Sequence, residues 1–466
     1  MDDTRIFRIR PLTRVFDSQE LAKREIYLCT PEELNDPLEG HLEVEWAGDR
    51  ILWRNLFSHY VLCLMHGILN TIPQTPGEFD SPKLDARYTA DSLPTDGMKE
   101  LYRSSCDRFW QNDVMEQLPE LLEAGENAIR TEGMRLLARR VHFPAFDAVT
   151  RAMESEGCLP NGWRAEQLPE LSRLNLAQLQ QIPKLQASTD LEAIAFALNS
   201  VEESSFLREQ FRRSDRTSAQ ARLKDYALRL FPDLYVDALL RDLIHPEWHT
   251  ASFTKECSNA AMWATYGQNH TGVALVLNRP SPWLKLTGVN GSRSSVHRPE
   301  RELTQGAFQG ALHDVTYSDH PPRLNFFEQI GNLPSECVRR TWHSDHDGRL
   351  SQKISALHAD LQRWRDEHRE LHLRAVTTKR NDWVYEKEQR LLIRDDLGLR
   401  SEPGDNRKVT YAEEHLSGIV FGLRTPSRDR LRIIETVERT LSHGRRDVFS
   451  FYQMKYSHAT RRLHMV

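Results

Sequence analysis

Residues 249–277 read HTASFTKECSNAAMWATYGQNHTGVALVL, and this stretch indicates the fold class. Its beginning, HTASFT, and its end, TGVALVL, have the composition and patterning of strands. The segment between them, CSNAAMWATYG, is typical of a short helix. A strand, a short helix and a second strand in succession predict a sheet with helices packed on it, which is an α+β fold.

Strands are also predicted near both ends of the chain. Residues 5–11, RIFRIRP, alternate polar and apolar side chains and end at a proline, and residues 25–29, EIYLC, resemble a second strand. Strand character returns at 311–319, 383–393 and 418–422, and again in the FSFYQMKYS and RRLHMV segments. The N-terminal strands need partners, and the C-terminal half of the chain offers them.

The residues between these two groups of strands have a different composition. Apolar residues recur there at helical spacing, and the other positions are rich in Glu, Arg, Gln and Ala, which favour helix. The predicted helices cover residues near 48–72, 98–124, 125–155, 165–182, 189–214 and 217–243. A long charged helix is expected at about 350–376, and RDRLRIIETVERTLS is a clear amphipathic helix.

The chain of 466 residues therefore divides into three segments. Residues 1–47 and 248–466 are expected to form the two parts of one split, mixed β core. Residues 48–247 are expected to form a large all-α insertion between them. The fold class predicted from the sequence is α+β with this helical insertion.

Composition and charge narrow the classes of protein. A net charge of −5 gives no argument from the whole chain for binding to nucleic acid or to a membrane surface. The six cysteines form no CxxC pair, so neither a zinc site nor a disulfide framework is predicted, and reduced thiols fit a cytoplasmic location. The N-terminus lacks the apolar run of a signal peptide, and the apolar stretch 51–72 includes Arg54 and His59, which disfavours a membrane span.

Two polar clusters are interpreted as surface features. The cluster at 343–347 contains two His and two Asp residues, but its spacing fits no strong ligand motif, so a polar loop is preferred and no metal ligand is expected. The run 206–224 is basic with interspersed acids, and a solvated helix face is preferred over a surface for phosphate backbones.

Three of the predicted strands each carry two polar side chains at i and i+2. The pairs are Arg8 with Arg10, Ser252 with Thr254, and Glu386 with Glu388. Side chains two residues apart lie on the same face of a sheet, so each pair lines one face. Arg390 continues the face of the Glu pair. A half-buried strand normally turns one face to the core, and the other face is available to a functional cleft.

The segments that carry these pairs resemble a bacterial family. IFRIRPL, the NDPLEG turn, SFTKECSNAAMWATYGQNHTGVAL and WVYEKEQRLLI are similar to the domain of unknown function DUF2971. The resemblance covers roughly the first 45 residues and the stretch from about 249 to 455. The family itself implies no activity.

The order of the pairs also resembles the R–S–E pattern of ADP-ribosyltransferases. In that superfamily an Arg on a first strand holds the phosphate or ribose of NAD, and a later Ser–Thr strand shapes the nicotinamide pocket. The resemblance gives Arg8 or Arg10 the first role, and Ser252 with Thr254 the second. The middle strand here reads Ser-Phe-Thr and lacks the final Ser of the fuller pattern.

The same resemblance assigns the catalytic positions. Glu388 would bond the nicotinamide ribose, Glu386 would help to engage the acceptor, and Trp263 or Tyr266 would cover the nicotinamide ring. A carboxylate beside the ribose suits the chemistry, because cleavage of the nicotinamide–ribose bond develops positive charge on the ribose carbon. Since a carboxylate in a cleft contributes little to packing, Glu388→Gln is expected to abolish turnover with little loss of stability.

Structural interpretations compete with each assignment. The Glu pair and Arg390 resemble a solvated helix face with an i,i+4 ion pair. The two arginines could protect an exposed edge strand, and Trp263 and Tyr266 are more often core residues than ligand platforms. Asn35 and Asp36 are more often part of a turn than of a site.

The expected function is therefore an NAD-dependent ADP-ribosyltransferase-like enzyme, with NAD as substrate and a protein, a nucleic acid or water as acceptor. A bacterial toxin or antiphage-defence role is implied by analogy, and the insertion would select a target or bind a partner protein. The alternatives are a nucleotide-sensing or protein-interaction module without catalysis, and a metal-dependent nucleic-acid enzyme.

Overall fold

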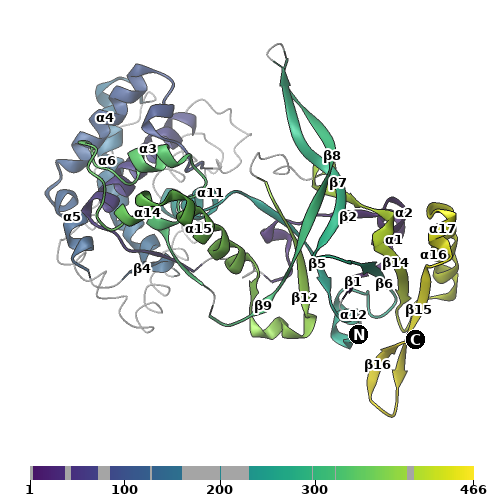
Figure 1. Ribbon diagram of the computed structural model, residues 1–466. Coiled ribbons are helices and arrows are strands. Elements are labelled where there is room, and N and C mark those ends of the chain that lie inside the picture. The colour runs from purple at the N-terminus through teal and green to yellow at the C-terminus, as the bar shows by residue number, and fades with distance from the viewer. Residues whose placement is uncertain are drawn as a thin grey trace, which may run out of the picture. The chain divides into compact units, whose positions relative to one another are not determined.

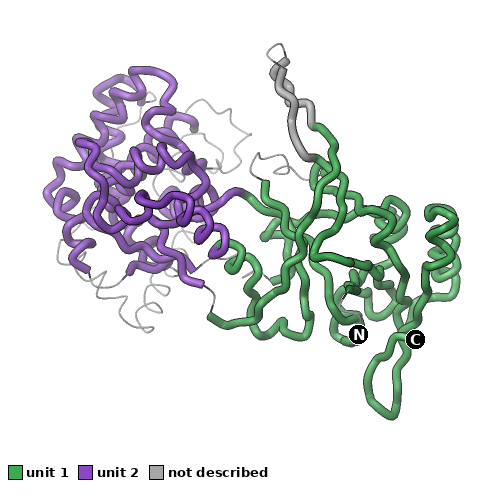
Figure 2. The backbone as a smooth tube through the Cα atoms, in the orientation of Figure 1, with its two compact units in different colours: residues 1–41, 247–321, 372–466 green, residues 42–246, 322–371 purple. Residues whose placement is uncertain are grey.

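The chain forms two compact units in the structure, which is a computed structural model. The described residues are 4–36, 43–71, 84–125, 128–159, 200, 230–295, 298–320, 322–395 and 404–466. Unit 1 consists of Met1–His41, Glu247–Pro321 and His372–Val466, and unit 2 consists of Leu42–Pro246 and Pro322–Leu371 (Figure 2). The sequence divides the chain at 47/48 and 247/248, and it does not separate residues 322–371 from the C-terminal segment.

Unit 1 is built on a mixed sheet of eleven strands in the order β16-β15-β14-β6-β1-β5-β12-β8-β7-β13-β2 (Figure 1). The strands are β1 (Arg5–Arg10), β2 (Glu25–Tyr27), β5 (Trp248–Thr254), β6 (Val273–Asn278), β7 (Trp283–Ser295), β8 (Arg298–Asp314), β12 (Glu388–Arg394), β13 (Lys408–Tyr411), β14 (Leu416–Phe421), β15 (Ser450–Ser457) and β16 (Arg462–Met465). The sheet curls strongly, because Cys29, which follows β2, exchanges two backbone hydrogen bonds with Thr250 of β5.

The N-terminal strand lies in the middle of this sheet. β1 is antiparallel to β6 along its whole length, from Arg5 opposite Asn278 to Arg10 opposite Val273, and it meets β5 at Phe7 opposite Thr254. All other strands of the sheet except β2 come from the second half of the chain. The expected pairing of N-terminal and C-terminal strands is therefore present in one mixed sheet.

The two faces of the sheet pack on different helices. One face, which we call the α16 face, carries Ile6, Leu275 and Leu391 and packs on α1 (Leu12–Phe16), α2 (Glu20–Lys23) and α16 (Ser427–Thr440). The other, the α12 face, carries Phe7 and Ile9 and packs on α12 (Ala260–Thr265). Alternate residues of β1 thus belong to two different cores. The short helix α17 (His443–Arg446) and a two-stranded sheet of β9 (Thr316–Tyr317) and β11 (Thr378–Lys379) complete unit 1.

Unit 2 is mainly helical. Its helices are α3 (Arg50–Thr71), α4 (Asp96–Trp110), α5 (Asp113–Glu123), α6 (Thr131–Ser155), α11 (Phe231–Asp242), α13 (Ser335–Thr341), α14 (Ser355–Ala359) and most of α15 (Leu361–Val376). A small sheet of β10 (Arg323–Asn325), β3 (Glu43–Trp46) and β4 (Ile129–Arg130) adds to them. In the part of the chain that the structure describes, no helix combines the length and apolar character needed to cross a membrane.

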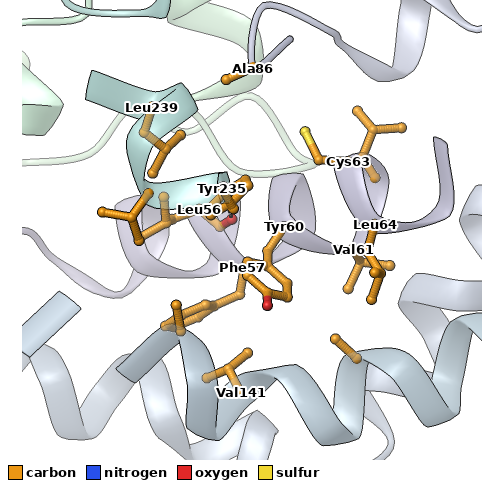
Figure 3. Packing of buried hydrophobic residues seen from close by; sticks show 14 of the residues in the cluster. Leu56, Phe57, Tyr60, Val61, Cys63, Leu64, Ala86, Val141, Tyr235 and Leu239 are labelled. Atoms are coloured by element: carbon orange, nitrogen blue, oxygen red, sulfur yellow. Dashed lines mark hydrogen bonds between the residues drawn. The ribbon is translucent and has the colours of Figure 1, made fainter. Parts of the chain in front are cut away.

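Helix α3 lies at the centre of unit 2 and is buried on several sides. Phe57 and Tyr60 of α3 meet side chains of α6 and α11 (Figure 3). Two histidines are satisfied inside this core, because the Tyr60 hydroxyl bonds Nδ1 of His142 at 2.9 Å and Nδ1 of His59 bonds the Tyr235 hydroxyl at 2.9 Å. The polar residues that argue against a membrane span thus have partners within a packed helical core.

Several predicted elements differ from those in the structure. The helix expected at 98–124 is two helices, because Asn112 caps a new one with its side-chain oxygen. β12 begins only at Glu388, after a 3₁₀ helix at Asn381–Glu386, and the long β7–β8 hairpin is not predicted as such. Most of the helices expected at 165–182, 189–214 and 217–243 lie outside the described residues. The prediction of mixed α and β content is correct.

Replacing Phe57 by Ala should destabilise unit 2 by about 3–5 kcal/mol, because Phe57 is fully buried and its removal leaves a cavity in a packed core. Denaturant unfolding followed by circular dichroism, which reports mainly on helix, measures this loss. Glu154→Ala, at an exposed position of α6, is the control and should change the free energy of unfolding by about 0.5 kcal/mol or less. Equal effects of the two variants would show that α3 does not lie in a packed core.

Candidate functional site

Four charged side chains meet on the α12 face of unit 1, where β12 begins. The Nζ of Lys379 lies 2.8 Å from Oε2 of Glu386 and 3.3 Å from Oε2 of Glu388. Arg390 donates from Nε and Nη2 to the two oxygens of Glu388, both at 3.0 Å. All four side chains are buried, and their two negative charges balance two positive ones. We call these four residues the ion cluster.

The backbone before β12 sets the position of Glu386. The 3₁₀ helix Asn381–Glu386 ends at Lys387, which adopts a left-handed conformation with φ 45°. The Thr254 hydroxyl donates to the carbonyl oxygen of Glu386 at 2.6 Å and fixes this turn to the end of β5. Glu386 and Glu388 therefore do not form an i,i+2 pair on one strand as the sequence predicts. Their carboxylates still converge, because Lys379 bonds both.

Glu388 is held in its ionised form. Burial by itself raises the pKa of this carboxyl group, but the charges of Arg390 and Lys379 and hydrogen bonds from Arg390 and Ser252 outweigh burial and lower its pKa below the usual value of 4.5. Arg390 is itself fixed, since its Nη1 donates to the carbonyl oxygen of Val376 at 2.5 Å. The cluster thus presents a negative charge of fixed position at neutral pH.

A half-buried tyrosine connects the ion cluster to the surface. The Tyr266 hydroxyl donates to Oε1 of Glu386 at 2.6 Å, and it also hydrogen-bonds the side chain of Asn35, which is exposed. Burial and the contact with Glu386 raise the pKa of Tyr266, so the phenol keeps its proton. Ser252 is exposed beside Glu388 and shares a hydrogen bond with it.

A second tyrosine supports the other side of the cluster. The backbone N–H of Glu388 donates to the Tyr317 hydroxyl at 2.8 Å. Burial raises the pKa of Tyr317 to about 12, so this phenol is also neutral at physiological pH. The ring of Trp383 lies 4.8 Å from Nζ of Lys379 and adds a cation–π contact. Tyr266, Tyr317 and Trp383 are all half-buried and form an aromatic rim around the charges.

The structure does not bring the two arginines of β1 to this site. Phe7 and Glu388 both lie opposite Thr254 on neighbouring strands, so Phe7 shares the face of Glu388. Arg8, the next residue, points to the α16 face, where its guanidinium lies 5.7 Å from the ring centroid of Phe253. Arg10 points to the same face and pairs with Glu20 at 2.9 Å. The sheet separates both arginines from Glu388.

Trp263 does not lie on a ligand surface. Its side chain is 0% exposed, and its indole N–H donates to the carbonyl oxygen of Cys257 at 2.6 Å. It packs with Phe7 and Ile9 as a core residue of the α12 face. The assignment of Trp263 as a cover for a nicotinamide ring conflicts with this burial, whereas Tyr266 reaches both the cluster and the surface.

Two residues of the site were not assigned a role from the sequence. Lys379 carries one of the two positive charges of the cluster, and Asn35, interpreted above as part of a turn, contacts Tyr266. A lysine in the polar segment TTKRND gives no periodic signal, because its partners depend on how β11 pairs with β9. The charges of Glu386 and Glu388 next to a buried strand could have indicated that a cation from elsewhere must balance them.

The polar cluster of residues 343–347 lies in unit 2, in a turn. Nδ1 of His343 lies 2.8 Å from Nε2 of His358, and Asp345 accepts backbone hydrogen bonds from Asp347 and Arg349. Nowhere among the described residues do three or more His, Cys, Asp or Glu side chains form a group that could hold a metal ion. The six cysteines are free thiols. The basic run 206–224 lies outside the described residues.

The fold and site thus define a mixed α/β unit with a buried, charge-balanced pair of carboxylates, joined to a mainly helical unit. Residues 262–391 match the family described as Protein of unknown function (DUF2971). This match includes the whole ion cluster and Tyr266, but it reaches neither β1 nor Ser252, although the resemblance noted above extends to both. No curated protein matches the chain, and no solved structure matches it.

Replacing Lys379 by Met should destabilise unit 1 by about 3–5 kcal/mol, because two carboxylates would lose a buried cationic partner. Lys387→Met is a matched control two residues from neither partner more than Glu386 and Glu388 themselves, since Lys387 lies between them but is 52% exposed and pairs with Glu256. That variant should cost about 0–1 kcal/mol. Thermal or denaturant unfolding measures both, and equal losses would contradict the structural role of Lys379.

Acid should weaken the contribution of Glu388 to stability. Its folded pKa is lowered, so below pH 4.5 the unfolded state binds more protons, and stability present above that pH is lost as the pH falls through the folded pKa. Glu388→Gln should therefore lower the free energy of unfolding at pH 7, and the gap to wild type should narrow below pH 4.5. Denaturant unfolding at a series of pH values tests this, and a gap that is constant with pH would argue against a lowered pKa.

Proposed function

We propose that unit 1 is an ADP-ribosyltransferase-like enzyme that uses NAD, with Glu388 as the carboxylate beside the nicotinamide ribose. The observation that carries the proposal is the convergence of Ser252, Tyr266 and Glu386 around an ionised Glu388 on one face of the sheet. Residues from three separate segments meet there, in the order along the chain that the superfamily resemblance implies. The match of residues 262–391 to a family of unknown function is compatible with this activity but does not name it.

The reaction would break the bond between the ribose carbon and the nicotinamide nitrogen. Nicotinamide leaves as a neutral base with the electron pair of that bond, and the ribose carbon develops positive charge. The fixed negative charge of Glu388 stabilises that charge without a change in its own protonation. An oxygen or nitrogen atom of the acceptor, a macromolecule or water, then bonds to the ribose carbon and loses a proton.

Glu386 and Tyr266 are placed for the acceptor side of this reaction. The Tyr266 hydroxyl donates to Glu386, and the ring is half-buried at the surface next to Asn35. An acceptor hydroxyl could take the place of the Tyr266 proton on Glu386, which would then receive the acceptor's proton. Tyr266 also offers its ring face to the planar nicotinamide.

The pyrophosphate role that the resemblance gives to Arg8 or Arg10 has no support in the geometry. Both side chains lie on the α16 face, while Ser252 and Glu388 lie on the α12 face. The proposal therefore rests on the Ser252, Tyr266 and Glu386 contacts of Glu388 and leaves β1 out of the NAD site.

Binding of a nucleotide without reaction is a second candidate, and one observation favours it. Both oxygens of Glu388 already accept hydrogen bonds from Arg390, and one of them also contacts Lys379. A carboxylate engaged in this way has less capacity left for a ribose hydroxyl. In that case NAD would raise the unfolding temperature with no release of nicotinamide. The metal-dependent nucleic-acid alternative has no such support among the described residues.

The expected burial of Glu388 changes how the proposal must be tested. The sequence suggests that Glu388→Gln leaves stability intact, but in the structure this change removes the partner of two buried cations and should cost several kcal/mol, on the order of 3–5 kcal/mol. A loss of activity in that variant alone would therefore be ambiguous. Tyr266→Phe and Ser252→Ala each remove a hydroxyl at the rim and keep the ion cluster whole.

The decisive measurement is nicotinamide release from NAD by the purified full-length protein in the presence of cell lysate. Wild type should release nicotinamide, and Tyr266→Phe and Ser252→Ala should each reduce the rate about 10- to 100-fold while unfolding at a temperature close to that of wild type, as expected for loss of one hydrogen bond in the reacting site. Glu414→Gln, an exposed position paired with Lys285, is the control and should be fully active.

Two outcomes would overturn the proposal. One is the absence of nicotinamide release by folded wild-type protein with every acceptor fraction of the lysate. The other is release at the wild-type rate by both rim variants together with Glu388→Gln, assayed below its own unfolding temperature. Stabilisation by NAD without release would transfer the assignment to the binding module.

A further inference from the structure

The guanidinium of Arg8 is a buried charge without a counter-charge. The side chain is 5% exposed, and its Nη1 has no hydrogen-bond partner among the described residues. No described carboxylate lies at ion-pair distance from it, and its nearest recorded contact is the ring of Phe253. Burial, and then the charge of Arg10, lower the pKa of Arg8 to about 9, so it is still charged at neutral pH. An uncompensated buried charge is costly, and proteins normally pair it.

Two further polar atoms near Arg8 lack partners. The hydroxyl of Tyr411 is fully buried without a hydrogen bond, and Nε of Arg24 is in the same condition. Tyr411 is within electrostatic range of both Arg8 and Arg24. Each of these atoms can donate a hydrogen bond, so this part of the α16 face holds several donors and lacks acceptors among the described residues.

The charges around this point are unbalanced in the same sense. Arg8 and Arg10 lie on one strand, and Glu20 of α2 is the one carboxylate that pairs with them, through Arg10. Arg24 pairs with a different carboxylate, Glu413, at 3.5 Å. One positive charge, that of Arg8, therefore remains over. A bound anion would supply both the missing charge and the missing acceptor atoms.

The end of β1 provides a route to solvent. The side chain of Arg10 is 22% exposed, Cys29 is half-buried, and Arg14 of α1 is exposed. All three interact electrostatically at this end of the strand. A small ligand would pass these cationic side chains on its way to Arg8, and they would attract a negative charge.

We infer that Arg8, Arg10 and Tyr411 form a binding site for a phosphate group on the α16 face of unit 1. Arg8 supplies an unpaired guanidinium, Arg10 supplies a second charge whose fork is shared with Glu20, and Tyr411 supplies a neutral donor. A tetrahedral oxyanion has enough acceptor positions for all of them.

This site is separate from the one proposed for NAD. The register of β1, β5 and β12 puts Arg8 and Glu388 on opposite faces of the same sheet, so a single nicotinamide ribose held by Glu388 does not share contacts with Arg8. The inference therefore does not depend on the proposed enzymatic activity. A phosphate here would act on unit 1 as a stabilising ligand from behind the sheet.

The test compares inorganic phosphate with chloride at equal ionic strength, using thermal unfolding and calorimetric titration of the full-length protein. Phosphate raises the unfolding temperature of most proteins slightly, because it is excluded from their surfaces, so variants are needed to separate specific binding. Wild type should show saturable binding of one phosphate and a larger rise in unfolding temperature than Arg8→Met. In chloride, Arg8→Met should unfold at the same temperature as wild type or higher, because it removes an unpaired buried charge.

Matched variants complete the experiment. Arg5→Met lies on the same strand at an exposed position and should keep the full phosphate response. Tyr411→Phe removes one buried hydroxyl and should weaken phosphate binding about tenfold, as expected for one hydrogen bond to a charged group. Ribose 5-phosphate in place of phosphate shows whether the group arrives free or on a larger molecule, by which of the two binds more tightly.

Three results would overturn the inference. The first is no saturable phosphate binding by wild type. The second is the same phosphate response in wild type and Arg8→Met. The third applies if Arg8→Met does not fold, and it is an unchanged phosphate affinity in Tyr411→Phe. Loss of nicotinamide release with intact phosphate binding would affect the proposed function alone.

Discussion

The contact of Lys379 with two glutamates connects three pieces of chain that would otherwise be independent. Lys379 ends β11, Glu386 ends a 3₁₀ helix, and Glu388 begins β12, so the two ion pairs join these elements at one point. Arg390 extends the connection to Val376 at the end of α15. The low-polarity surroundings make each of these interactions strong and make each unpaired member costly. The position of the aromatic rim follows from this arrangement, since Tyr266 and Tyr317 both bond to the segment that carries the carboxylates.

Strand alternation decides which polar residues share a site. Each half-buried strand of the sheet divides its side chains between two cores, and a polar pair at i and i+2 reveals that both members point the same way. It does not reveal which way, because that depends on the partner across the ladder. In β1 the partner of Phe7 is Thr254, and this single pairing puts Arg8 and Arg10 behind the sheet. The same alternation leaves Arg8 in a region with a deficit of acceptors.

Much of the fold could be predicted from local patterns, and less of the site. The helical character around residues 50–71 and 131–155, the strands at 5–10, 248–254 and 416–421, and the mixture of α and β structure follow from periodicity that is visible in short windows. The start of β12 was placed too early, because WVYE has strand composition but turns through a 3₁₀ helix and a left-handed Lys387. Lys379 and Asn35 escaped notice because their roles come from contacts across long stretches of sequence. Trp263, by contrast, was recognised as a residue type that is usually core, and it is fully buried.

The central position of β1 has a consequence for the order in which the protein is made. Residues 5–10 are among the first to be synthesised, yet their ladder partners at 273–278 follow only after most of unit 2. At about 5–20 residues per second, the ribosome needs tens of seconds to supply that partner strand. During this interval an apolar strand with two open edges has no native neighbour, so unit 1 begins to form from its middle only when its second half appears. The helical unit, whose longest helices come from one continuous part of the chain, can fold in the meantime, and we expect synthesis to complete unit 2 around α3 before the sheet of unit 1 closes.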